Sequence, residues 1–414
     1  MIRKLLITAC LVLASVQLAA AQNFYRGVEA YKRGDFAATL REMLPLAERG
    51  DLRAQLVVGA MYDQGKGVEQ NHVEAARWFR RSAEQGNAKA QLSLGGLYIK
   101  GTGVSQDFAE AVKWFRMAAE QGDSDAQVSL GHLYARGNGV SEDYVEAAKW
   151  FQKAAEQGNV SAQYALGLAY NHGAGIQQDF GEAAKWLRMA AEQGNADAQF
   201  ELAALYNGGK GVPKDDGEAA KWNLMAAEQG LASAQFIHGL RLLEGKGVRQ
   251  DAREAVRWFK LAAERGDADA QTKLGVAYAR GIGVPQDYEE ATKWLRRGAE
   301  QGNADAQADL GVSYFHGNGV PKNFGEAMKW ARLAAEQGDA KAQFMVGLFY
   351  YNGQGVPQDF VGAHMWLELA EAKGFDQANK ARESVAGHMT ATEISTAKQL
   401  ARECLVRKYT ECER

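Results

Sequence analysis

The 414-residue sequence has little proline, little cysteine and little net charge. Five prolines beside 46 glycines argue against collagen and low-complexity linkers, so the glycines are expected at regular structural positions. A formal net charge of −3 gives no support for nucleic-acid binding. The sequence contains 46% hydrophobic and 24% charged residues, a composition typical of a folded protein rather than a disordered one.

Residues 1–21 have the layout of a secretory signal peptide. Arg3 and Lys4 precede an apolar run that is too short for a membrane span, and three alanines ending at Ala21 offer a cleavage site. The alternative is lipoprotein cleavage before Cys10, although that cut would leave almost no hydrophobic segment. We therefore expect an exported protein, periplasmic or secreted, with no membrane span after removal of the signal.

All nine tryptophans are spaced 36 residues apart, from Trp78 to Trp366. An Ala-Gln dipeptide and a Gly-x-Gly pair recur at the same interval. A fixed period of this length indicates a stack of repeated units, and nine of them fill residues 51–374 without an insertion.

The unit that starts at Asn87 shows why each repeat should fold as a helix–turn–helix hairpin. Asn87 is a good N-cap for a helix with apolar residues at i, i+4, i+7 and i+8, and Gly101 stops that helix. Asp107 with Glu110 predicts a capping box that opens a second helix. We expect this second helix to bury Ala111, Trp114, Phe115, Ala118 and Ala119.

A single hairpin of this kind cannot be stable alone. Burying one tryptophan of ~200 Å² contributes ~5 kcal/mol, whereas ordering 36 residues costs roughly 50 kcal/mol of conformational entropy. The stability must come from stacking between neighbouring units, with alanines and positions such as Gly95 permitting close approach of the helices.

In its recurring residues the chain resembles the Sel1-like repeat family, a branch of the tetratricopeptide superfamily. The residues that carry the resemblance in one unit are Ala90-Gln91, Leu94-Gly95, Tyr98, Gly101-x-Gly103-Val104, Asp107, Glu110-Ala111, Trp114, Ala118-Ala119 and Gly122. The resemblance implies an all-α, right-handed superhelical solenoid of helix–turn–helix repeats with helical caps at both ends. It also implies a protein–protein adaptor, and many exported bacterial members serve envelope assembly, signalling or host contact.

Both ends of the repeat array resemble caps of that family. Residues 22–50 look like a plain tetratricopeptide half-unit that would cap the start. Residues 375–414 look like the C-terminal cap, in which Thr390 and Glu393 predict a capping box that opens a helix running to about Lys408.

Cys404 and Cys412 remain as an even pair after removal of the signal. On one continuous helix the eight residues between them would span ~12 Å, and a disulfide needs Cα atoms within roughly 7 Å. Either the helix ends between them and the chain turns back, or they pair with something else. We favour the intrachain disulfide.

A curved stack of helices offers a long concave groove for an extended or helical partner. We expect the first helix of each unit to contribute residues to this groove. One apolar register and one aromatic register are candidates for binding the partner. Packing between repeats explains both registers as well. The apolar register contains Leu168, Leu240, Val276, Val312 and Leu348, and the aromatic register contains Tyr164, Phe200, Phe236 and Phe344.

The sixth unit departs most from the pattern. Leu231 replaces the N-cap, His238 replaces the core leucine and Leu242 replaces the tyrosine. His238 is either a satisfied core residue or a specific contact of a unit that bends the solenoid, and we keep it among the candidate binding residues.

No constellation of catalytic residues is found in the sequence. The seven histidines show no His-Glu-x-x-His spacing, and nothing pairs a nucleophile with a base. We predict no catalytic residues, no cofactor and no metal, and a monomeric, non-enzymatic envelope scaffold that binds a protein or peptide.

Two rival functions follow from the family resemblance. One is a secreted factor that binds host proteins. The other is binding or hydrolysis of β-lactams or peptidoglycan, which is linked to cysteine-rich members with a disulfide in each repeat. This chain departs from those members because no cysteine lies in its nine units.

Overall fold

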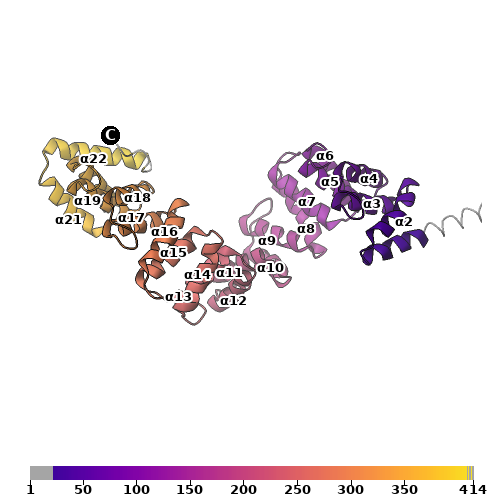
Figure 1. The fold of residues 1–414 in the computed structure, drawn as a ribbon, viewed down its shortest axis with the longest axis horizontal. Helices are drawn as coiled ribbons and strands as arrows, with labels where there is room; N and C mark the ends of the chain where they lie inside the picture. Colours follow the sequence, from indigo (N-terminus) through magenta and orange to yellow (C-terminus); the bar gives the residue numbers. More distant parts are fainter. Residues whose placement is uncertain (1–21, 408, 410–411, 413–414) are drawn as a thin grey trace, which may run out of the picture. The chain divides into compact units, whose positions relative to one another are not determined.

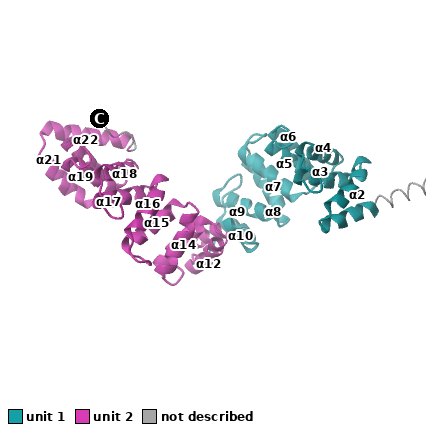
Figure 2. Ribbon diagram, viewed as in Figure 1, with its two compact units in different colours: residues 1–198, 210–213 teal, residues 199–209, 214–414 magenta. Residues whose placement is uncertain are grey.

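The computed structural model describes residues 22–407, 409 and 412, and all regular structure within them is helical (Figure 1). The predicted signal peptide, residues 1–21, lies outside the described residues. The chain divides into two compact units (Figure 2). Unit 1 comprises Met1–Ala198 and Lys210–Pro213, and unit 2 comprises Gln199–Gly209 and Lys214–Arg414.

Each unit is a succession of helices, most of which pack on the next one along the chain. Residues 22–32 are helical and precede α2 (Phe36–Glu48). The first helices of the repeats are α3 (Leu52–Gln64), α5 (Ala88–Lys100), α7 (Ser124–Arg136), α9 (Val160–His172), α11 (Ala196–Gly208), α13 (Ala232–Glu244), α15 (Ala268–Arg280), α17 (Ala304–His316) and α19 (Ala340–Asn352). The second helices are α4 (His72–Glu84), α6 (Phe108–Glu120), α8 (Tyr144–Glu156), α10 (Phe180–Glu192), α12 (Asp216–Glu228), α14 (Ala252–Glu264), α16 (Tyr288–Glu300), α18 (Phe324–Glu336) and α20 (Phe360–Ala372). Two more helices, α21 (Asp376–Ala386) and α22 (Ala391–Val406), follow the last repeat.

The first helices begin and end as the sequence predicts. The Asn87 side chain accepts a hydrogen bond from the N–H of Ala90 at 3.1 Å, and Gly101 ends α5 in the left-handed conformation with φ of 68°. Leu231, which replaces the N-cap in the sixth repeat, makes no side-chain capping bond. The helix–turn–helix prediction is therefore confirmed.

The second helices begin differently from the prediction. The Asp107 side chain accepts from the N–H groups of Ala109 and Glu110, but Glu110 does not return a bond to Asp107. The N–H of Asp107 already donates to the carbonyl of Tyr98 at 3.0 Å, and the Glu110 carboxylate pairs with Lys113 at 2.5 Å. The predicted capping box is thus only half formed. A complete one opens α22, where Thr390 and Glu393 bond each other as predicted.

The tryptophans join one repeat to the preceding one. Trp150 of α8 lies in the same hydrophobic cluster as Phe115 of the repeat before it and Leu130 of its own repeat. Trp114 packs in the same way on the cluster around Phe79 but is half-buried, so the prediction that α6 buries it holds only in part. The other four residues predicted to be buried in α6 are buried. A tryptophan shared between two hairpins is accordingly part of the stacking energy of the array.

Glycines permit two kinds of close approach. A Cβ at Gly95 would lie 2.6 Å from the ring of Phe115, so this glycine lets the two helices of one hairpin come together. A Cβ at Gly139, the second glycine of a Gly-x-Gly pair, would lie 2.4 Å from the carbonyl carbon of Phe108. That contact joins the loop of one repeat to the start of the second helix of the preceding repeat.

Each first helix carries a buried glutamine, and in most repeats it links three helices. The Nε2 group of Gln91 donates to the carbonyl of Ala83 on the preceding α4 at 3.0 Å. Its Oε1 accepts from the side chain of Gln121, at the end of α6, at 2.8 Å. The same pair of bonds recurs at Gln127, Gln163, Gln271 and Gln307. We call this series the glutamine ladder.

At the C-terminal end, α22 covers the outer face of α20. Val361, Met365 and Leu369 of α20 are buried in one cluster with residues of α22. In α18 the residue equivalent to Met365 is Lys329, whose side chain is 59% exposed. Replacement of lysine by methionine therefore makes this face apolar enough for α22 to pack on it. The preceding helix, α21, was not predicted, because its N-cap residue Phe375 makes no capping bond.

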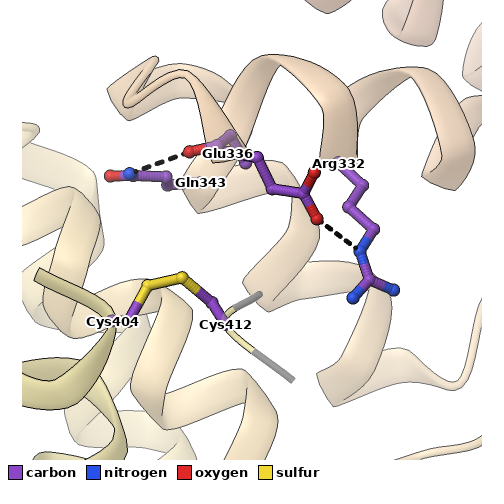
Figure 3. The surroundings of a disulfide bond; sticks show 6 residues. Arg332, Glu336, Gln343, Cys404 and Cys412 are labelled. Carbon is purple, nitrogen blue, oxygen red and sulfur yellow. Dashed lines mark hydrogen bonds and ion pairs between the residues drawn. A yellow bond between two sulfur atoms is a disulfide. The ribbon is translucent and has the colours of Figure 1, made fainter. Parts of the chain in front are cut away.

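The two cysteines lie in this terminal segment. Helix α22 ends at Val406, and Tyr409 takes a φ of 67°, so the chain turns back. Cys404 and Cys412 form a disulfide with their Cα atoms 4.9 Å apart. Figure 3 shows the disulfide near the ion pair of Arg332 and Glu336 on α18.

The close contact at Gly139 predicts a specific loss of stability. Gly139→Ala and Gly158→Ala both place a side chain at positive φ, which costs ~1–2 kcal/mol. Only Gly139→Ala also forces a Cβ against the backbone of the preceding repeat, because nothing lies within 4 Å of a Cβ at Gly158. We expect Gly139→Ala to lower the free energy of unfolding by about 1–3 kcal/mol more than Gly158→Ala. Urea unfolding followed by circular dichroism measures the difference, and equal losses would contradict this account of the second glycine.

Candidate partner-binding surface

The nine candidate residues of the two sequence registers are all half-buried on the first helices. Half-burial leaves part of each side chain available for a partner and uses the rest for packing. Their neighbours decide which of these roles dominates at each repeat.

Three of the candidates, Val312, Phe344 and Leu348, lie together in unit 2. They line a groove of about 330 Å³ between α17, α19 and the start of α21. Three further apolar side chains that the sequence reasoning did not select, Phe315, Met345 and Phe349, complete the lining of the groove. One of these, Met345, directly follows Phe344 on α19.

One wall of the groove comes from the C-terminal cap. Phe375, which precedes α21, packs its ring 4.9 Å from that of Phe344, and Gln377 of α21 also lines the groove. The groove therefore depends on the position of α21 as well as on the two repeats.

The polar edge of the groove carries little free charge. Lys341 is paired with Asp309 at 3.0 Å. The other polar lining residues are His316, Asn352, Gln354 and Gln377. Side-chain amides both donate and accept hydrogen bonds, so this edge suits the N–H and C=O groups of a peptide backbone. An apolar floor with a few convergent polar groups is the usual composition of a binding pocket.

Other candidates in unit 2 contribute mainly to packing. The ring of Phe236 lies 5.9 Å from that of Phe259 in the same hairpin, and Leu240 packs on the same cluster. Phe200 contacts the cluster around Ala226, and Val276 packs against the cluster of the following repeats. The structure does not bring these four residues into the groove with Val312.

Unit 1 contains the candidates Tyr164 and Leu168 on α9 and a second apolar groove elsewhere. That groove, of about 340 Å³, lies between the helical residues 22–32 and α3. Its lining includes Leu56 and Ala60, which occupy the same two registers as Phe344 and Leu348. The sequence reasoning missed it because the leucine and alanine are less conspicuous than aromatic residues.

His238 lies in the core of the sixth repeat. It is 3% exposed, and its ring meets that of Trp258 edge-on at 5.3 Å. Burial lowers the pKa of His238, and Nδ1 has no hydrogen-bond partner among the described residues. A side chain in this position cannot contact a partner directly, so the structure does not support His238 as a binding residue.

A second polar residue of this repeat escaped the sequence reasoning. Arg241 occupies the register of the buried Leu97, and it is itself 6% exposed. Its Nη2 group donates to Oδ1 of Asn207 at 3.2 Å, and its Nη1 group donates to the carbonyl of Lys246 at 3.4 Å. Burial lowers the pKa of Arg241.

Neither a metal site nor a membrane-spanning helix is present among the described residues. Within residues 22–407, 409 and 412, no group of histidine, cysteine, aspartate and glutamate side chains is arranged to hold a metal ion. Over the same part of the chain, no helix has both the length and the apolar content to cross a membrane.

Comparisons with known proteins agree on the repeat. The Sel1 repeat model matches nine consecutive segments, residues 52–87, 88–123, 124–159, 160–195, 196–231, 232–267, 268–303, 304–339 and 340–375. No curated protein matches the sequence.

Two solved structures are similar over most of the chain. One is a protective antigen present in uropathogenic Escherichia coli strains displaying an SLR fold, with 32% identity and a TM-score of 0.62, covering 95% of this chain and 93% of that chain. The other is a Sel1 repeat protein from Oxalobacter formigenes, with 38% identity and a TM-score of 0.59, covering 75% of this chain and 90% of that chain.

The surroundings of His238 predict that leucine is the better residue there. Leu202 and Leu274 occupy the same register in the neighbouring repeats, so His238→Leu should fit and should remove an unpaired buried nitrogen. We expect a gain of about 1–3 kcal/mol in the free energy of unfolding at pH 7. The folded state lowers the pKa of His238, so the free energy of unfolding of the wild type falls as the pH drops below about 6.5. The difference in free energy of unfolding between His238→Leu and wild type therefore increases at lower pH. Urea unfolding between pH 5 and 8 measures this. His172→Gln is the exposed control, and a gap that does not change with pH would show that His238 is not buried in its neutral form.

Proposed function

Because the chain belongs to the Sel1 repeat family, we propose that it is a non-enzymatic scaffold of the bacterial cell envelope that binds a protein or peptide partner. The groove between α17, α19 and α21 is the binding site in this proposal, and its apolar lining is the observation that carries it. Repeat arrays of this superfamily are typical protein–protein interaction scaffolds.

The composition of the groove supports a peptide segment as ligand. Aromatic and long aliphatic anchors dominate protein–protein binding energies when they enter a pocket, and Phe315, Phe344 and Met345 offer such a pocket. The amide edge at Asn352, Gln354 and Gln377 would bond the backbone of the bound segment. The partner is then a segment with one or two bulky apolar side chains beside exposed backbone groups.

Export is part of the proposal, with the periplasm as the compartment. It is supported by the signal-like layout of residues 1–21 and by the disulfide of Cys404 with Cys412, since disulfides persist in oxidising compartments. The alternative is a secreted factor that binds host proteins. The description of the Escherichia coli relative as a protective antigen favours keeping that alternative.

We further propose that the protein is a monomer and that it neither binds nor hydrolyses β-lactams or peptidoglycan. A monomer is supported by the apolar end of the repeat array being covered by α22. The nine repeats carry no cysteine, unlike the cysteine-rich relatives for which that chemistry is considered.

Peptide selection tests the groove. A random peptide library displayed on phage is selected against the full chain, and we expect the enriched peptides to carry bulky apolar residues. Leu348→Asp places a charge on the groove floor and should weaken their binding at least about tenfold, because that charge must be desolvated. Leu261→Asp, at a leucine 39% exposed on α14, is the matched control and should leave binding unchanged. Equal effects of the two variants, with both folded by circular dichroism, would reject the groove as the site.

A reporter fusion tests export. Residues 1–21 joined to alkaline phosphatase, which is active only in an oxidising compartment, should give active enzyme in a bacterial host. Replacing Arg3 and Lys4 with glutamate should abolish the activity, because the charged start of a signal peptide is needed for its recognition. An inactive wild-type fusion would overturn the envelope part of the proposal.

A further inference from the structure

One histidine lies completely buried beneath the C-terminal cap, which we define as α21 and α22. His364 of α20 is 0% exposed, at a register held by Ala76, Val112 and Met328 in other repeats. Neither ring nitrogen has a hydrogen-bond partner among the described residues. Oε2 of Glu368 lies 3.6 Å from Nδ1, beyond hydrogen-bond distance. The ring is therefore buried without a hydrogen bond, beside one carboxylate of its own helix.

The charged groups around His364 come from the cap and from α20 itself. Arg382 on α21 and Lys398 on α22 both act against a positive charge on the ring. Two carboxylates of α20 favour that charge: Glu368, whose Oε2 lies 3.6 Å from Nδ1, and Glu371. The Glu371 carboxylate is already bonded to Nε of Arg382 at 2.6 Å and to Asn379 at 2.7 Å. Helix α19 also packs on α20, and its only charged side chain is Lys341, paired with Asp309. The other titratable side chains of α19 are those of Tyr350 and Tyr351.

The same cap forms a wall of the binding groove. Phe375, the N-cap residue of α21, contacts Phe344 of α19, and Gln377 lies in the first turn of α21. The bonds of Glu371 to Asn379 and Arg382 hold α21 against α20. Anything that separates α21 from α20 therefore removes one side of the groove.

We propose that the C-terminal cap is an acid-sensitive gate, in which a proton taken up by His364 below neutral pH releases α21 and α22 from α20. Release of the cap does not depend on the proposed function, whereas the resulting loss of partner binding rests on it. The occupant of the groove would then bind near neutral pH and dissociate in a mildly acidic environment.

The sign of the effect follows from linkage. Burial, and then Arg382 and Lys398, lower the pKa of His364 from 6.5 to about 4 in the closed cap. With the cap open the ring is solvated and regains its ordinary pKa, so the open state binds more protons between pH 6.5 and 4. Opening therefore becomes easier as the pH falls through this window and is unaffected above it. At pH 5 the opening equilibrium constant should be about 30-fold higher than at pH 7.5.

Amide hydrogen exchange of the full chain tests the gate without any partner. After correction for the intrinsic exchange rate, protection of α21 and α22 should fall about 30-fold from pH 7.5 to pH 5, while α15 and α16 serve as the internal reference. His364→Met, which copies Met328 of the preceding repeat, should abolish the fall. His388→Gln changes an exposed histidine between α21 and α22 and should leave the fall intact. A fall that persists in His364→Met, or wild-type protection that does not change with pH, would overturn the gate.

Two further measurements separate the gate from the groove. In nuclear magnetic resonance of the wild type, the ring of His364 should remain neutral at pH 5.5 in the closed state, and titration near pH 6.5 would overturn the proposal even if His364→Met failed to fold. Peptides selected for the groove should bind at least about tenfold more weakly at pH 5 than at pH 7.5. Equal binding at both pH values, with the cap shown to open, would reject regulation of the groove. Failure to select any peptide would reject the proposed function while the exchange result still stands for the gate.

Discussion

The buried glutamine of each first helix sets the constraint on which the rest of the repeat depends. Leaving a buried amide unpaired costs about 1–3 kcal/mol, so both ends of the side chain must find partners. Gln91 finds them eight residues back at Ala83 and thirty residues ahead at Gln121. An insertion anywhere in that span would break one of the two bonds. This explains why nine repeats follow one another with one period and with helices of one length.

The glutamine ladder, the tryptophans and the paired glycines fix the architecture, and variation at the half-buried positions of the first helices decides where a groove can form. At the register of Leu348 the chain carries Gly96 in the second repeat and Ala204 in the fifth. A groove forms in unit 2 where large side chains fill this register on α17 and α19 and where Phe344 and Met345 stand beside it. The position of the groove is thus set by residues that differ between repeats, not by the residues that all repeats share.

The sequence predicts what local chemistry decides, including the helix ends at Asn87 and Gly101 and the turn-back of the chain between Cys404 and Cys412. It does not predict what tertiary contacts decide. The capping box at Asp107 fails because its N–H is already bonded to the carbonyl of Tyr98, a bond that exists only once the hairpin has closed. Periodicity likewise cannot say that Trp150 packs on the preceding hairpin. The groove escaped prediction for the same reason, since α21, which forms one wall, starts at Phe375 without a capping signal.

The pattern is also broken at the end of the array, and the breaks there have a common consequence. Lys373 stands where seven of the other eight repeats carry the second glutamine of the ladder, and Oε1 of Gln343 has no partner in the described part of the chain. The cap is therefore held by the apolar face of Met365 and by the bonds of Glu371, without a ladder bond. A buried histidine inside the array, such as His238, is enclosed by repeats on both sides, and its protonation would have to open them. His364 lies beneath the cap at the end of the array, so the same charge has less structure to displace there.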